Sequence, residues 1–164
     1  MLKTRRAFED GHQRKFLVVL DETPECEQAI VYAARRAERT GGGLVMLYIV
    51  PPSEFQHWLG VEEIMRAEAQ AEADATIDRY VGLLRGRGLA LTPERLVREG
   101  KALEEITKLI QDDEDIAILV LGAGTGKEGP GPLVSAIAGG RGAFPVPLTI
   151  VPGDLDDDTI EAIA

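Results

Sequence analysis

Short apolar runs alternate along this chain with segments whose apolar residues recur at helical spacing. The strands expected from these runs are 16–20, 44–50, 89–97, 116–121 and 147–152. The first, second and fourth runs carry no charged residue, which is typical of strands buried on both faces of a parallel sheet. Pro93 indicates that the third strand lies at a sheet edge, because proline cannot donate a ladder hydrogen bond.

Helices are expected between these strands. They are predicted from Pro24 to the glycines at 41–43, over about 61–84, over 102–110 and over 133–138. Thr23 is expected to cap the first helix, with Pro24 in its first turn. Strands that alternate with helices pair in parallel through right-handed crossovers. The sequence therefore predicts a single-domain α/β fold, a doubly wound five-stranded parallel sheet with about four helices, Rossmann-like, in the strand order 3-2-1-4-5.

Length and composition fit one globular domain. The chain has 164 residues, 45% of them hydrophobic, which is enough for one core of ordinary size. The domain is expected to span 15–152, between a polar N-terminal arm (1–14) and an acidic C-terminal tail (153–164), both solvated apart from one helical turn in the tail. The formal net charge of −10 argues against nucleic acid as a partner, and no apolar run is long enough to cross a membrane.

The few cysteine and histidine residues limit the disulfides and metal sites that the chain can form. The single cysteine, Cys26, cannot form an internal disulfide, and the first fifteen residues lack the apolar stretch of a signal peptide, so a cytoplasmic location is expected. Cys26 is predicted to be buried and inert. His12 and His57 lack metal-ligand spacing, so no metal site is predicted, and His57 with Trp58 is expected in a loop over the ligand crevice.

A glycine- and proline-rich segment, 122–132, follows the fourth expected strand. Backbone N–H groups without flanking side chains, close to a helix start near Ser135, favour anions. A phosphate-bearing small molecule is one interpretation, and a flexible connector is the other. Doubly wound sheets bind ligands where the strand order reverses. Asp21 and Gly122 would therefore face one crevice if the first and fourth strands are neighbours.

Two common phosphate-binding motifs do not describe this segment. A P-loop would require glycine at position 121, which is leucine, and a hydroxyl after Lys127, where Glu128 stands. A Gly-x-Gly-x-x-Gly pattern occurs at 124–129, but it follows the fourth strand, and prolines separate it from the next helix. In a glycine-rich segment such a match is expected by chance.

Four features together carry a family resemblance. They are Val18-Val-Leu-Asp21 followed by Glu22-Thr23, the strand end Leu47-Tyr48-Ile49-Val50, the glycine segment after the fourth strand, and the last strand Pro147-Leu-Thr-Ile-Val151. Over roughly 15–152 the chain resembles the universal stress protein family. That resemblance implies that Asp21 closes the first strand, that the backbone of 47–50 binds adenine, and that a Gly-x2-Gly-x9-Gly-Ser/Thr motif binds ribose and phosphates.

The glycine motif is matched in either of two registers. One register uses Gly126, Gly129 and Gly139, with Gly140 in place of the hydroxyl residue. The other uses Gly122 and Gly124 at the strand end, with Val134 in place of the third glycine and Ser135 as the hydroxyl residue. We prefer the second register because it starts at the strand end and leaves room for a helix before the last strand.

The resemblance implies a homodimeric, adenine-nucleotide-binding stress-response protein that pairs through its last strand, Pro147–Pro152. Its ligand would be ATP or AMP, with Mg²⁺ present only alongside the nucleotide. The residues expected to hold the ligand are Asp21, Glu22, Thr23, Tyr48, Ile49, Gly122, Gly124, Thr125, Gly126, Lys127 and Ser135. Ser135 would bind phosphate or cap the following helix, and Lys127 would pair with phosphate or stay solvated. The predicted role is regulatory, with weak ATPase activity at most; a nucleotide-free interaction module and a slow ATP hydrolase are the alternatives.

Overall fold

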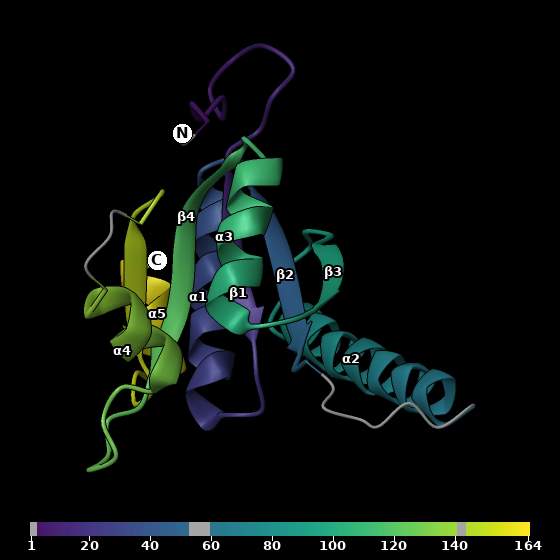
Figure 1. Cartoon of the computed structure of the whole chain (residues 1–164). Coiled ribbons are helices and arrows are strands. Elements are labelled where there is room, and N and C mark those ends of the chain that lie inside the picture. Colours follow the sequence, from purple (N-terminus) through teal and green to yellow (C-terminus); the bar gives the residue numbers. More distant parts are fainter. Residues whose placement is uncertain (1–2, 53–59, 141–143) are drawn as a thin grey trace.

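A five-stranded parallel sheet forms the centre of the computed structural model, which describes residues 3–52, 60–140 and 144–164 (Figure 1). The strands are β1 (Lys15–Leu20), β2 (Gly43–Val50), β3 (Glu94–Glu99), β4 (Ile116–Ala123) and β5 (Leu148–Pro152). They lie in the order β3-β2-β1-β4-β5, and every neighbouring pair is parallel. The predicted doubly wound architecture and its strand order are confirmed.

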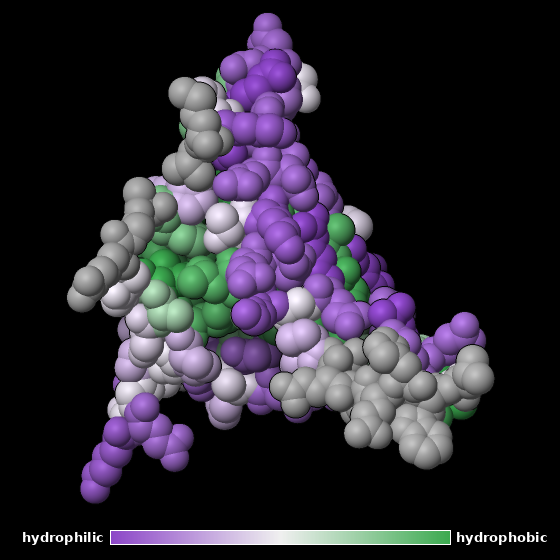
Figure 2. Space-filling model, in the orientation of Figure 1, coloured by the Kyte–Doolittle hydropathy of each residue, from purple (hydrophilic) through white to green (hydrophobic). Residues whose placement is uncertain are grey.

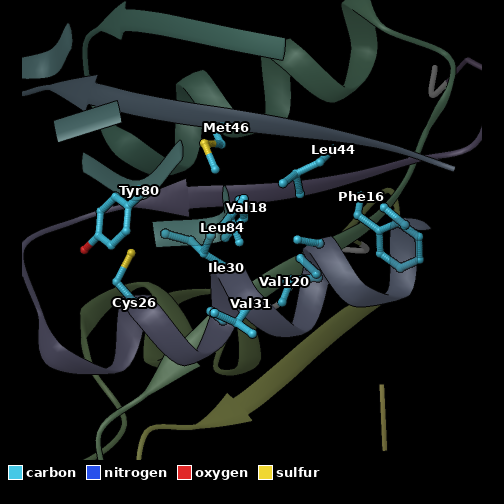
Figure 3. Close-up of a cluster of buried hydrophobic side chains, with 14 of the residues drawn as sticks. Phe16, Val18, Cys26, Ile30, Val31, Leu44, Met46, Tyr80, Leu84 and Val120 are labelled. Atoms are coloured by element: carbon cyan, nitrogen blue, oxygen red, sulfur yellow. The ribbon is translucent and has the colours of Figure 1, made fainter. Parts of the chain in front are cut away.

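Helices cover both faces of this sheet. They are α1 (Pro24–Arg39), α2 (Val61–Gly86), α3 (Ala102–Asp112), α4 (Pro132–Ala138) and α5 (Asp157–Ile163). One buried cluster joins α1, α2 and α5 to Val18 (Figure 3). A second joins α3 and α4 to Leu17 and Val19, because successive strand side chains point to opposite faces. Within the described ranges, no helix has the length and apolar composition needed to cross a membrane.

The segment 89–93 does not belong to β3, contrary to the sequence prediction. Leu89 is buried in the first cluster, and its N–H donates to the Leu84 carbonyl over 3.0 Å, which closes the end of α2. Pairing between β2 and β3 begins at Glu94, directly after Pro93, which has no N–H to donate. β3 does lie at the edge of the sheet, as Pro93 indicated.

The N-terminal arm is not simply solvated; it packs against the amino ends of the strands. The Arg5 guanidinium donates to three backbone carbonyls of α3 and the segment that follows it, the shortest bond being 2.5 Å. His12 Nδ1 lies 2.6 Å from Asp115 Oδ1. A cation suits this place because the last carbonyls of a helix lack partners within the helix.

The acidic segment 153–164 ends in a fifth helix, α5, where one solvated turn was expected. Asp156 caps this helix by accepting from the Thr159 N–H over 2.8 Å. Ile160 is only 1% exposed and packs in the first cluster, and Arg35 Nε pairs with Glu161 Oε2 at 2.7 Å. The tail is therefore docked on the first cluster by the buried side chains of Ile160 and Ala164 and by the partly buried Leu155, which lie among acidic neighbours in the sequence.

Candidate functional site

Two cavities open at the carboxyl edge of the sheet, where the strand order reverses. β1 pairs with β2 on one side and with β4 on the other. The inner cavity, about 200 Å³, lies between the β1–α1 connection and α4. The outer cavity, about 670 Å³, lies between the start of α1 and residues 124–131, which we call the glycine loop. Asp21 and Gly122 both line the inner cavity, so the ends of β1 and β4 face one crevice, where α/β sheets bind their ligands.

Asp21 follows β1 and closes the turn into α1. Its Oδ1 accepts from the Thr23 N–H at 2.8 Å and from the Thr23 hydroxyl, and its carbonyl accepts from the Tyr80 hydroxyl at 3.0 Å. The carboxylate also interacts with the Cys26 thiol, and in the described part of the chain no N–H or hydroxyl group donates to Oδ2. This exposed carboxylate oxygen is free to accept hydrogen bonds from hydroxyl groups of a ligand.

Thr23 stands at the N-cap position of α1, as predicted, but its side chain makes no cap hydrogen bond. Its hydroxyl donates to the Asp21 carboxylate, and a charge-assisted bond of this kind is stronger than one between neutral groups. Pro24 occupies the first turn as predicted and removes one N–H that would otherwise need a cap.

Cys26 forms part of the floor of the inner cavity and is 2% exposed. Burial raises the pKa of its thiol to about 11, although the Asp21 N–H, 3.4 Å from the sulfur, acts in the opposite direction. The group is therefore a neutral thiol at physiological pH. The prediction of a buried, inert cysteine agrees with this environment.

The glycine loop folds back on itself and is not an open connector. The Gly124 N–H donates to the Pro130 carbonyl at 3.2 Å, which closes the loop, and the Gly129 N–H donates to the Gly126 carbonyl at 3.2 Å. Gly129 has a φ of +85°, which glycine adopts without strain. Two of the backbone donors in this loop are thus already engaged inside the protein.

Helix α4 begins at Pro132, so Ser135 lies within the helix and is not its cap. Proline is favoured at the first helical position, so the helix starts at Pro132, one residue before the predicted span 133–138 and about one turn before the start suggested near Ser135. The Ser135 N–H donates to the Gly131 carbonyl at 3.1 Å, and its side chain is exposed and lines neither cavity. Val134 is buried and lines the inner cavity in its place.

Sequence comparison agrees with this geometry. Residues 13–135 match the model of the universal stress protein family. The chain belongs to that family. Comparison with the curated proteins found no match.

Solved structures of universal stress proteins share the fold. UspA from Lactobacillus plantarum is 21% identical, with a TM-score of 0.66 over 84% of this chain and 97% of that chain. A universal stress protein from Archaeoglobus fulgidus is 20% identical, with a TM-score of 0.58 over 88% and 98%. A universal stress protein in complex with cAMP is 15% identical, with a TM-score of 0.57 over 84% and 96%.

The predicted site residues of this universal stress protein fall into two groups, those that line one of the two cavities and those that line neither. Asp21, Thr23 and Gly122 line the inner cavity, and Thr23, Gly124, Thr125, Gly126 and Lys127 line the outer one. Glu22, Tyr48, Ile49 and Ser135 line neither. The structure thus brings Asp21 together with the glycine segment and leaves the end of β2 outside both cavities.

Tyr48 and Ile49 lie near the end of β2, and their side chains pack against the two clusters on opposite faces of the sheet. Burial raises the pKa of Tyr48, and the negative charges of Glu72 and Glu22 raise it further, so Glu22 lies near the phenol. Adenine binding by this backbone stays a prediction. His57 and Trp58, expected over the crevice, lie outside the described residues.

Glu25 is the residue of this edge that sequence reasoning missed. It lies in the first turn of α1, is half-buried and lines both cavities. An acidic residue in a first helical turn is common because the helix dipole favours negative charge there. No signal in the sequence distinguished Glu25 from such an ordinary position.

Proposed function

We propose that this universal stress protein binds an adenine nucleotide, AMP or ATP, in the crevice between β1 and β4, and acts in the cytoplasm as a regulator and not as a catalyst. The observation that carries this proposal is the shared lining of one cavity by Asp21 and Gly122 at the point where the strand order reverses. A structural relative in complex with cAMP supports the choice of an adenine ligand. Mg²⁺ would enter only with the nucleotide.

The lining of the inner cavity suits a nucleoside. Val19, Leu121 and Val134 provide an apolar floor, and Asp21 and Thr23 provide polar groups at the rim. Ligand pockets commonly combine an apolar wall with a few polar groups that fix orientation. We propose that the base lies on the apolar floor and that a ribose hydroxyl donates to Asp21 Oδ2.

Replacing Asp21 with asparagine tests this proposal. Asparagine retains an oxygen for the Thr23 bonds but replaces the free carboxylate oxygen by an amide, so binding is expected to weaken about tenfold or more. The measurement is calorimetric titration with adenosine, AMP and ATP. Asp10→Asn removes the same charge from the exposed N-terminal arm at the other edge of the sheet and serves as the control. Equal affinities for the two variants would contradict the assignment of Asp21.

A second candidate function is that of an interaction module, which has the same fold but binds no nucleotide. Val134 in the cavity wall and the exposed side chain of Ser135 favour it, because the hydroxyl implied by the family motif does not line the crevice. The same titration separates the two classes. An absence of heat for all three ligands, with no nucleotide retained through purification, would favour the interaction module.

We also propose that the protein is a homodimer that pairs through β5. β5 is an edge strand of the sheet, and Ile150 on it is 43% exposed. Figure 2 shows an apolar area over β4 and β5, between α3 and α4, where Phe144 and Leu148 are only partly buried. Exposed apolar edge strands are usually covered, and a second copy of the same strand covers both edges at once.

Ile150→Lys is expected to convert the dimer to a monomer, because it places a charge at the centre of the proposed pairing edge. The measurement is light scattering coupled to gel filtration. Ile163→Lys, which changes an exposed isoleucine on α5, is the matched control and should remain dimeric. A monomeric wild type, or a dimeric Ile150→Lys variant, would rule out this interface.

A further inference from the structure

Glu25 separates the two cavities at the carboxyl edge of the sheet. Its side chain lines the inner cavity beside Asp21 and the outer cavity beside the glycine loop. Among the described residues it has no hydrogen-bonded or ion-paired side chain to offset its charge. The dipole of α1 favours this charge, but no described cation pairs with it, so the carboxylate presents a negative charge to any ligand that reaches from one cavity into the other.

Two glycines make room for Glu25 in this place. A Cβ at position 153 would lie 2.6 Å from the Glu25 Cβ, and one at position 122 would lie 2.7 Å from its carbonyl carbon. A Cβ at position 124 would lie 2.9 Å from the Gly129 carbonyl oxygen of its own loop, whereas its 3.5 Å separation from Oε1 of Glu25 is ordinary van der Waals contact. Packing against Glu25 therefore accounts for Gly122 and Gly153, and closure of the glycine loop accounts for Gly124, without any phosphate.

The charges around the two cavities oppose a polyphosphate. Asp21, Glu25 and Glu128 contribute three carboxylates to the described lining, against the single ammonium group of Lys127. The N–H groups of Gly124 and Gly129 are engaged inside the loop. Among the described residues, no three acidic, histidine or cysteine side chains are grouped to hold a metal ion that would offset these carboxylates.

We propose that Glu25 determines the ligand class of the crevice: it admits a nucleoside or a nucleoside monophosphate and rejects a metal-free triphosphate. This inference rests on the proposed adenine-binding function and restricts it. Asp21 and Glu25 have complementary roles, because carboxylates accept hydrogen bonds from sugar hydroxyls and repel phosphate oxygens. The glycine loop is then a shaped wall beside Glu25 and not a phosphate cradle.

The test is a calorimetric titration of the wild type, Glu25→Gln and Asp10→Asn with adenosine, cAMP and ATP in the presence of EDTA. The wild type is expected to bind adenosine or cAMP at least about tenfold more tightly than ATP. Glu25→Gln keeps the shape of the side chain and should tighten ATP binding about tenfold relative to adenosine binding in the same variant. Asp10→Asn removes a charge at the other edge and should keep the wild-type ratio.

A salt series on the wild type gives a second reading that does not depend on any variant. Raising NaCl from about 0.05 to about 0.5 M should tighten ATP binding by screening the repulsion. A cationic phosphate site would instead bind ATP less tightly as the salt concentration rises. Equal affinity for ATP and adenosine, or an unchanged ratio in Glu25→Gln, overturns the role of Glu25 and leaves adenine binding standing. Absence of binding by every ligand to every protein overturns both proposals.

Discussion

Gly122→Ala is expected to destabilise the fold by about 3 kcal/mol or more, as overpacking of a closed site does. A Cβ at position 122 would overlap the carbonyl oxygen of Glu25 and lie 2.7 Å from its carbonyl carbon. Both atoms belong to the backbone of α1, so no side-chain rotation relieves the overlap. Residue 122 is also held from the other side, because it pairs with Val151 of β5. The new methyl group can be accommodated only if α1 moves away from the end of β4.

Gly126→Ala is the matched control for this change. It lies in the glycine loop, four residues after Gly122 of β4, and nothing lies within 4 Å of the Cβ that it would gain. Its expected effect is within about 0.5 kcal/mol, as for other open surface positions. Urea unfolding of both variants measures the difference. A Gly122→Ala variant as stable as Gly126→Ala would mean that the close approach of α1 to β4 is not a constraint on the fold.

Glycine content alone did not identify what lies against these glycines. The sequence showed correctly that the backbone after β4 carries few side chains, and the alternation of strands and helices predicted the strand order and the crevice between β1 and β4. The packing partner of Gly122 and Gly153 is Glu25, about a hundred residues or more earlier in the chain. No local pattern reports a contact of that kind, because it depends on β1 and β4 being neighbours and on how closely α1 approaches them.

The strands and long helices were predictable because their apolar periods are long and consistent. Errors arose at boundaries and at the two ends of the chain. Leu89 packs as a helix-closing residue although it lies in a strand-like run, and Ser135 lies one turn inside α4. Arg5 anchors the N-terminal arm, and Ile160 and Ala164 anchor the C-terminal segment. A few anchoring residues among charges show no clear periodicity, so composition suggested solvated arms at both ends.

Ile160→Ala is expected to lower the free energy of unfolding by about 2–4 kcal/mol, the usual cost of truncating a fully buried isoleucine. Ile160 is 1% exposed and packs in the cluster formed by α1, α2 and one face of the sheet. The truncation would leave a cavity between α5 and α1. The ion pairs of Glu161 with Arg35 and Arg39 are partly exposed, so they are expected to offset little of the loss.

Ile163→Ala provides the comparison on the same helix. Ile163 is 54% exposed, so its truncation should change stability by less than about 0.5 kcal/mol. Both substitutions have the same effect on helix propensity and net charge, so the difference between them isolates the burial of Ile160. Equal stabilities in urea would mean that α5 is detached from α1 in solution and that the acidic segment is a solvated tail after all. A clear loss for Ile160→Ala alone would make residues 153–164 an integral part of the folded domain.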